Sequence, residues 1–371
     1  MKKVELITLQ RVPNYGSVLQ CYATQKIINE LGYECEVIDY YPERMSIKGM
    51  LKNIKNKTEK FKKSLLLRTA ARIIIFPSYI KRFRVFKSFL RKNIKMTDKT
   101  YKNNEELIKN TPKADIYCTG SDQVWNSDWN GGIDKALFLD FAPNNKRKIA
   151  YAASFGKNQL DEFEIKETKK MLKKYKKISL RESNGVKIME SLGIDDTINV
   201  VDPTLLLTGD EWRKISSNKY ANEKYILVYN LNRNKKIDKY AENLSKKTGL
   251  KVKFLSYQLH EFYKKGKMYC NPVVEDFLAL IDNAEYVISD SFHATAFSIN
   301  FNTNFIIVFP NKFSSRVKSI LELTGLENRV AKDENDLEIC NKKIDFKYAN
   351  EIIKKEREKS LKWLANALKG E

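Results

Sequence analysis

Short runs of apolar, β-branched and aromatic residues alternate along the chain with longer stretches in which apolar residues recur every three or four positions. This alternation is typical of parallel sheets covered by helices, because each strand returns to its sheet through a helix. The pattern therefore predicts an α/β protein. In the first half of the chain the strand-like runs cover residues 4–8, 35–39, 115–120, 149–154, 178–182 and 198–202.

A second series of strand-like runs suggests a second domain. The 371 residues also exceed what one hydrophobic core usually serves. A polar stretch around Gly209 separates the two series, so we expect an N-terminal domain over 1–208 and a C-terminal domain over 222–371. The second domain should end in a helix with Ile353, Leu361, Leu364 and Leu368 near one face. The second series covers residues 225–231, 251–256, 285–290 and 304–309.

The positive charge of the chain is concentrated in one segment, residues 46–95. This segment holds sixteen Lys and Arg residues against a single acid, Glu59, and so carries fifteen of the 22 excess positive charges. Leu, Ile and Phe are interleaved with the charges, which is typical of a basic amphipathic surface that binds an anionic membrane. A pair of solvated helices is the alternative. Nucleic acid is not expected as a partner, because no nucleic-acid-binding motif accompanies the segment.

The rest of the composition indicates a globular protein of a reducing compartment. No apolar run approaches the roughly 18 residues that a membrane span needs, and the N-terminus lacks the features of a secretory signal. The five cysteines are odd in number and lack C-x-x-C spacing, which favours neither a disulfide framework nor a zinc site. We therefore expect a cytoplasmic protein without a bound metal.

Polar residues at the ends of strand-like runs are the candidates for chemistry. In "NYGSVLQ", Asn14 and Gly16 stand between the first run and a helix, whose N-terminal N–H groups suit an anion. In "GSDQVWN", Ser121 and Asp122 directly follow the third run. An ordinary strand-to-helix turn is the alternative for the first motif, and a turn capped by Asp122 beside a buried Trp125 for the second.

Arg181 lies at the end of a further run, and His293 follows another. Arg181, in "ISLRE", can bind a carboxylate or phosphate through two parallel hydrogen bonds, or form an ion pair between elements. His293, in "SDSFHATAFSIN", is one of only two histidines and should fall in the first turn of a helix. The positive end of a helix disfavours imidazolium there, unless Asp290 or a bound anion offsets it. A purely structural histidine is the alternative.

Taken together, six stretches resemble the polysaccharide pyruvyl transferase family. The resemblance covers nearly the whole chain except residues 46–95. It implies two Rossmann-like domains facing a cleft, as in GT-B glycosyltransferases. It also implies transfer of the carbon skeleton of phosphoenolpyruvate onto two sugar hydroxyls as a cyclic ketal, with release of phosphate and with no metal or further cofactor. The six stretches are "NYGSVLQCYATQ", "GSDQVWN", "YAASFG", "ISLRE", "VDPTLLLTGDEW" and "SDSFHATAFSI".

The resemblance also implies roles for single residues. His293 matches the general acid of the family, and Arg181 matches an arginine that grips the anionic groups of the substrate. Asp122 lies in the matching acidic loop and is expected to orient the acceptor hydroxyl. Characterised relatives place an arginine two residues before the histidine, where this chain has Ser291. Arg316, in "NKFSSRV", is the expected replacement cation. The substrate-binding set is completed by Ser291, Asn14, Gly16 and Ser121.

The leading hypothesis is thus a phosphoenolpyruvate-dependent, ketal-forming transferase for surface polysaccharide. Its acceptor would be a lipid-linked or nucleotide-linked sugar, and the basic segment would hold it on the inner face of the cell membrane. A GT-B glycosyltransferase that uses a nucleotide sugar is the second hypothesis. A non-catalytic protein of glycan assembly or membrane docking is the third.

Overall fold

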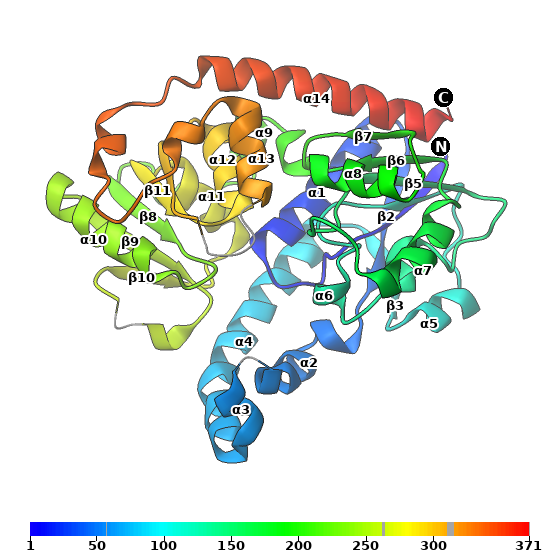
Figure 1. Cartoon of the computed structure of the whole chain (residues 1–371), viewed down its shortest axis with the longest axis horizontal. Helices are drawn as coiled ribbons and strands as arrows, with labels where there is room; N and C mark the ends of the chain where they lie inside the picture. The colour runs from blue at the N-terminus through cyan, green and yellow to red at the C-terminus, as the bar shows by residue number, and fades with distance from the viewer. Residues whose placement is uncertain (57, 262–263, 310–314, 371) are drawn as a thin grey trace. The chain divides into compact units, whose positions relative to one another are not determined.

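The computed structural model of the chain describes residues 1–56, 58–261, 264–309 and 315–370. The chain divides into two compact units. Unit 1 comprises Met1–Ser46, Ser88–Leu206 and Lys355–Glu371, and unit 2 comprises Ile47–Lys87 and Leu207–Lys354. Each unit is built on one parallel sheet with helices around it (Figure 1). The α/β class predicted from the alternating pattern is therefore confirmed.

Unit 1 contains a seven-stranded sheet in the order β3-β2-β1-β4-β5-β6-β7, and every neighbouring pair is parallel. This order contains the 3-2-1-4-5 arrangement of a Rossmann-like sheet. The strands are β1 (Lys3–Ile7), β2 (Glu34–Tyr40), β3 (Met96–Tyr101), β4 (Ile116–Thr119), β5 (Arg147–Ala153), β6 (Lys177–Leu180) and β7 (Thr197–Asn199). The helices are α1 (Tyr15–Glu30), α5 (Asn104–Lys109), α6 (Ser127–Asn130), α7 (Glu162–Leu172) and α8 (Ser183–Ser191).

Unit 2 repeats this arrangement with five strands in the order β10-β9-β8-β11-β12, again all parallel. The strands are β8 (Tyr225–Tyr229), β9 (Lys251–Ser256), β10 (Lys267–Cys270), β11 (Tyr286–Ser289) and β12 (Phe305–Ile307). The helices of its second segment are α9 (Gly209–Arg213), α10 (Lys235–Thr248), α11 (Val274–Asp282), α12 (Phe292–Phe301) and α13 (Ser315–Thr324).

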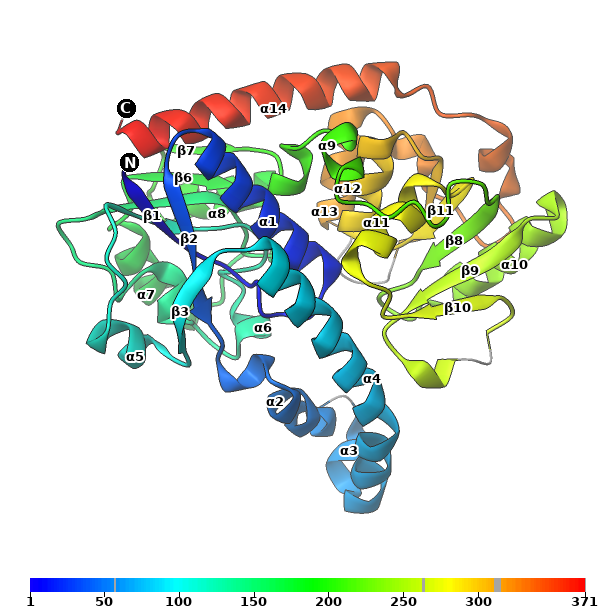
Figure 2. The same cartoon turned by 180° about the vertical axis from the view of Figure 1, so that it is seen from behind.

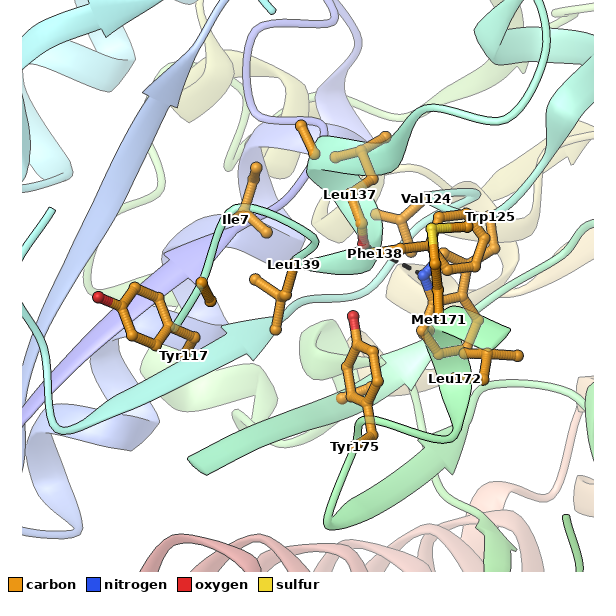
Figure 3. Packing of buried hydrophobic residues seen from close by; sticks show 14 of the residues in the cluster. Ile7, Tyr117, Val124, Trp125, Leu137, Phe138, Leu139, Met171, Leu172 and Tyr175 are labelled. Carbon is orange, nitrogen blue, oxygen red and sulfur yellow. Dashed lines mark hydrogen bonds between the residues drawn. The ribbon is translucent and has the colours of Figure 1, made fainter. Parts of the chain in front are cut away.

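The core of unit 1 contains the apolar residues of the "GSDQVWN" stretch, Val124 and Trp125. The Trp125 ring stacks on Phe138 with centroids 5.4 Å apart and lies 5.2 Å from the Phe155 centroid. Its indole N–H donates to the Leu137 carbonyl oxygen over 3.2 Å, the dashed line in Figure 3. Trp125 is therefore a buried packing residue whose one polar atom has a partner, which is what a buried tryptophan requires.

One carboxyl group is buried inside the first strand. Glu5 has no exposed surface, and it lies opposite Glu36 in the register of β1 and β2. The Lys3 ammonium lies 2.9 Å from the Glu5 carboxylate and 2.7 Å from that of Glu36. Burial raises the pKa of Glu5 to about 8 from its ordinary 4.5, and the attraction of Lys3 does not overcome it. Burial rather than the ion pair therefore decides the protonation of Glu5.

The basic segment does not follow the predicted boundary, which placed it in the N-terminal domain. It forms α2 (Ile47–Lys52), α3 (Glu59–Lys63) and α4 (Leu65–Asn93), and Ile47–Lys87 groups with unit 2. The contacts lie near the middle of α4. The Ser78 hydroxyl accepts from the Leu259 N–H over 2.9 Å, and the Arg82 guanidinium lies 3.9 Å from the Tyr257 ring centroid.

The last helix also crosses the predicted boundary. Helix α14 (Phe346–Lys369) was expected in the C-terminal domain, but Lys355–Glu371 groups with unit 1. The Ser360 hydroxyl accepts from the Val201 N–H over 3.1 Å, and Arg357 Nε donates to the Leu205 carbonyl over 2.8 Å. These bonds tie the helix to the strand end that follows β7. Over the described part of the chain, no helix is both long and apolar enough to cross a bilayer.

Candidate active site

The two sheets place the predicted residues at corresponding positions. In each sheet the strand order reverses next to the first strand, between β1 and β4 in unit 1 and between β8 and β11 in unit 2. Ligands of open α/β sheets bind beyond the carboxyl ends of the strands at this switch point. Beyond these ends lie Asn14 and Asp122 in unit 1, and in unit 2 His293 in the first turn of α12.

The β1–α1 turn is closed by its own side chain. Asn14 is the N-cap of α1, and its side-chain oxygen accepts from the Gly16 N–H over 2.9 Å. Gly16 lies in the first helical turn rather than before the helix. The N–H of Gly16 that was expected to face an anion is therefore used within the helix cap.

Asp122 lies in the loop that follows β4, and its backbone has a left-handed conformation that few non-glycine residues adopt. Its φ is 75°, and its backbone forms an isolated parallel bridge with Ala153. One carboxylate oxygen accepts from the Ser17 hydroxyl over 2.6 Å, and the other accepts from the Gln123 N–H over 2.9 Å. Left-handed backbone at a non-glycine residue costs energy and is frequent at functional sites. The strain marks Asp122 as a positioned group rather than a simple turn cap.

The end of strand β5 and the residues that follow it come close to the same stretch. Ala152 also has a positive φ, of 51°, and Gly156 has a φ of 60°. A Cβ atom on Gly156 would lie 2.1 Å from Gln123 Oε1, so a larger residue would displace the Gln123 side chain as well as adopt a backbone conformation that favours glycine. The "YAASFG" and "GSDQVWN" stretches are thus packed against each other at the carboxyl edge of the sheet.

Arg181 is buried among three carboxylates. Its Nη1 donates to Asp202 Oδ2 over 2.8 Å, and its side chain lies 3.7 Å from Asp122 and 3.6 Å from Glu182. Burial by itself would lower the pKa of Arg181, but the charges of Asp202, Glu182 and Asp122 outweigh it and raise the pKa. The guanidinium therefore stays charged and offsets the burial of these carboxylates. Direct contact between Arg181 and an anionic substrate stays a prediction.

Hydroxyl groups complete the network around Asp202. Ser121 donates to Asp202 over 3.3 Å, and both the N–H and the hydroxyl of Thr204 donate to its other oxygen, over 2.9 and 2.7 Å. A further hydrogen bond joins Ser154 to Glu182. No role was predicted from the sequence for Ser17, Glu182 or Asp202. The available signal was the position of Asp202, at the end of a strand-like run and directly before Pro203.

In unit 2, His293 lies in the first turn of α12, as the sequence predicted. The helix begins directly beyond β11, and its N-cap, Ser291, accepts from the Ala294 N–H over 3.4 Å. His293 is buried, and its ring packs edge-on against Phe292 with centroids 5.2 Å apart. Ser291 is buried as a cap, so the position at which relatives carry an arginine has a structural use here.

Asp290 fixes the loop beside His293. Its carboxylate accepts from the backbone N–H groups of Leu231 and Asn232 over 2.9 and 3.0 Å and from the Asn232 amide over 2.9 Å. Burial raises the pKa of Asp290, although these N–H donors act in the opposite direction. Asp290 therefore clamps the β8–α10 loop onto the start of α12, at the switch point of the second sheet.

The expected replacement cation, Arg316, lies in the first turn of α13 and is partly exposed. Helix α13 contacts α12, which carries His293. The stretch just before α13, residues 310–314, falls outside the described residues, so the place of Arg316 in the site stays a prediction. Within the described ranges, no group of three or more His, Cys, Asp or Glu residues is arranged to hold a metal ion.

A model of the polysaccharide pyruvyl transferase family matches residues 14–312, from the cap of α1 to beyond β12. This match spans most of the chain and includes Asp122, Arg181 and His293. The chain belongs to the polysaccharide pyruvyl transferase family. A search of curated proteins found no match. The family assignment confirms the resemblance seen in the six motifs and makes the protein a transferase of this family.

Similar solved structures show the fold of this pyruvyl transferase family member. One is the UDP-GlcNAc 2-epimerase of Neisseria meningitidis bound to UDP-GlcNAc, with a TM-score of 0.51, 11% identity and 100% coverage of both chains. Another is AviGT4, a glycosyltransferase of avilamycin A biosynthesis, with a TM-score of 0.50 and 10% identity over 100% of this chain and 99% of that one. These likenesses confirm the predicted GT-B-like class, with two Rossmann-like sheets in one chain.

Proposed function

We propose that this pyruvyl transferase family member transfers the pyruvyl group of phosphoenolpyruvate to two hydroxyls of a sugar and forms a cyclic ketal. The observation that carries the proposal is the position of His293. It is placed at the start of α12, at the switch point of the second sheet, within a chain of this family. A titratable imidazole at the ligand-binding edge of an α/β sheet is suited to proton transfer.

The proposed reaction balances without an oxidant or a metal. The first sugar oxygen bonds to C2 of phosphoenolpyruvate while C3, the methylene carbon, receives a proton and becomes a methyl group. The second sugar oxygen then displaces phosphate from C2. The two hydroxyls give up two protons in net; C3 takes up one and the departing phosphate the other, so the products are the ketal and hydrogen phosphate. Catalysis needs a proton donor near C3 and an acceptor near the sugar hydroxyls.

His293 is the proposed donor of the proton to C3. Asp122 is proposed to accept the proton of a sugar hydroxyl, because its carboxylate is oriented by Ser17 and by the Gln123 N–H. Arg181 would then act through Asp122, whose charge it partly balances at 3.7 Å. Arg316 is proposed to bind the donor phosphate or carboxylate. The hydrogen bonds of Asp290 are proposed to fix the β8–α10 loop beside His293.

The acceptor is proposed to be a lipid-linked or nucleotide-linked sugar of surface polysaccharide, modified in the cytoplasm at the inner face of the cell membrane. Phosphate release on mixing the protein with phosphoenolpyruvate and candidate acceptors tests the reaction. The modified sugar should gain the mass of one pyruvate less one water. In D₂O, the ketal methyl group should gain one deuterium from solvent. No phosphate release across the acceptor set, with deuterium absent from recovered donor, would contradict the proposal.

A glycosyltransferase that uses a nucleotide sugar is the second candidate. The fold likeness to AviGT4, a glycosyltransferase, favours it. Calorimetry with a nucleoside diphosphate and with phosphoenolpyruvate separates the candidates. Tight binding of the nucleotide alone would support the glycosyltransferase, and binding of phosphoenolpyruvate alone would support ketal transfer.

A further inference from the structure

The first half of α4 presents apolar side chains to solvent. Leu66 is 79% exposed and Ile73 is 70% exposed, and both lie in the first nine residues of the helix. Few soluble surfaces expose a contiguous set of large apolar side chains without a partner. We call this set the α4 apolar face. It consists of Leu65, Leu66, Leu67, Ile73, Ile74 and Phe76.

The α4 apolar face follows from helix geometry. Leu66, Ala70 and Ile73 are separated by four and three residues and therefore lie above one another on the same side of the helix. The other side is partly covered, where Arg72 Nε donates to the Leu51 carbonyl oxygen over 3.2 Å. The hydrophobic side of this half of α4 thus faces outward, which is the reverse of a helix that packs on a core.

Positive charges surround the face. Residues Ile47–Lys87, all part of unit 2, contain thirteen Lys and Arg residues and one acid, Glu59. Glu59 accepts a hydrogen bond from Lys62 over 2.6 Å. Figures 1 and 2 both show α2, α3 and the start of α4 projecting beyond the sheet of unit 2. The exposed lysines of these elements and the loop between α2 and α3 are Lys48, Lys52, Lys55, Lys60, Lys62 and Lys63.

We propose that the α4 apolar face is a membrane-docking surface, which inserts into the interfacial layer of an anionic bilayer while the surrounding lysines bind lipid phosphates. Leu65–Phe76 spans about 18 Å at roughly 1.5 Å per residue, which is short of the hydrocarbon thickness of about 30 Å. The helix therefore lies in the interface and does not cross. Apolar burial and attraction of basic residues to anionic lipid act together in this mode.

The charge decides between a membrane and the other partners of an apolar face. A second copy of the chain would bring one strongly positive segment against another, which opposes association. Nucleic acid would satisfy the lysines but leave Leu66 and Ile73 in water. An anionic lipid surface satisfies both the charges and the apolar side chains.

Co-sedimentation with vesicles tests the proposal. The intact protein should bind phosphatidylcholine vesicles that contain phosphatidylglycerol, and binding should fall with salt and with the phosphatidylglycerol content. The triple variant Leu66→Ser, Ile73→Ser and Ile74→Ser should bind at least tenfold more weakly, although its charge is unchanged. Its matched control replaces exposed apolar residues of unit 1 and should bind within twofold of the wild type. The control substitutions are Ile108→Ser, Phe163→Ser and Ile165→Ser.

A second pair of variants tests the charges. Lys60→Gln, Lys62→Gln and Lys63→Gln together should weaken binding at low salt at least tenfold, since each basic residue near an anionic surface contributes about 1 kcal/mol before screening. The control with Lys166→Gln, Lys170→Gln and Lys176→Gln removes the same number of exposed charges from unit 1. Equal losses in both variants would contradict a localised docking surface and indicate a general charge effect.

Insertion is measured directly with a label. All five native cysteines are buried, so Leu66→Cys gives a selective site for a polarity-sensitive fluorophore. The label should become brighter and blue-shifted on anionic vesicles, while a label at Phe163→Cys should not change. Absence of vesicle binding by the wild type at low salt would overturn the proposal. Dimers that the triple Ser variant abolishes would instead assign the face to a second copy.

These measurements use no substrate, so their outcome is independent of the proposed ketal transfer. The added suggestion that the acceptor is lipid-linked does rest on that function. It predicts that the triple Ser variant keeps wild-type turnover on a water-soluble acceptor and loses it selectively on an acceptor embedded in vesicles.

Discussion

The side chain of His293 is positioned by two neighbours in sequence. Ser291 caps the helix on which it stands, and Asp290 holds the loop beside it. Both act within one strand–helix turn, so this part of the site was readable from the short motif "SDSFH". Neither neighbour supplies a positive charge, so the cation proposed to bind the donor, Arg316, would come from another element of the chain.

Replacement of His293 by Gln should lower turnover about 10²- to 10⁴-fold and change donor affinity much less. Gln keeps much of the size and hydrogen bonding of the side chain but has no proton to give near neutral pH. Phosphate release per folded molecule measures the first effect and calorimetry the second. A structural histidine would give the reverse result, with a lower melting temperature and a nearly intact rate.

Glu5 should make the free energy of unfolding fall as pH rises from about 4.5 to 8. In this window the folded chain keeps a proton on Glu5 that the unfolded chain has lost, so raising the pH favours unfolding. Each pH unit corresponds to about 1.4 kcal/mol for one proton. Glu5→Gln cannot ionise, so it should gain at least about 1 kcal/mol relative to the wild type between pH 5 and 8 in urea unfolding. If the free energies of unfolding of the wild type and of Glu5→Gln changed with pH in parallel, Lys3 would be keeping Glu5 ionised.

At the scale of elements, Arg181 links the ends of three strands. It follows β6 and pairs with Asp202 beyond β7 and with Asp122 beyond β4. Such a link between distant parts of the sequence holds the carboxyl edge of the sheet together. Mutations of Arg181 or its carboxylate partners should therefore change the free energy of unfolding as well as substrate binding, and the two effects must be measured separately.

Asp202→Asn should lower the free energy of unfolding by about 3 to 5 kcal/mol. Removing one partner of a buried ion pair leaves the other charge in a poorly solvated place. Chemical denaturation measures the loss. Lys62→Ala, which removes an exposed pair with Glu59, serves as the control and should cost less than about 1 kcal/mol. A cost as small for Asp202→Asn would mean that water or Asp122 replaces the lost carboxylate.

Ten of the strands followed from the sequence, and for all of them but the partly buried edge strand β7 the reason is an apolar run that is largely buried in a parallel sheet. Strands β3 and β10 were not predicted. Both are edge strands, and their exposed polar residues break the apolar run. The site divides in the same way. Local features such as the helix start at His293 were predictable, whereas the pairing of Arg181 with Asp202 depends on strands that only the folded sheet brings together.

At the scale of the whole molecule, neither unit is one continuous stretch of chain. Unit 1 is assembled from three segments and unit 2 from two. Helix α4 and helix α14 each contain a point at which the chain passes from one unit to the other. The sequence suggested a single boundary near Gly209, because a polar stretch marks a linker but does not reveal where a distant helix packs.

Cutting the chain at that boundary should therefore give fragments that do not fold independently. Fragment 1–208 lacks Ser360 and Arg357, which bond to Val201 and Leu205, and fragment 209–371 lacks Ser78. We expect low solubility and poor secondary structure by circular dichroism for each fragment alone, and recovery when both are co-expressed. Two separately folded and cooperative fragments would show that the exchanged segments contribute little.

The divided units also set an order of events on the ribosome. Segment Ile47–Lys87 emerges long before its partner Leu207–Lys354, and synthesis of the intervening Ser88–Leu206 takes roughly 6 to 24 s at about 5 to 20 residues per second. During that time the α4 side chains that contact the second segment of unit 2 have no partners, because that segment has not yet been synthesised. Unit 1 waits longer still, because its segment Lys355–Glu371 follows all of unit 2 in the sequence. A ribosome that stops early would leave unit 1 without its closing helix, so a truncated product should be recognised as unfolded and degraded.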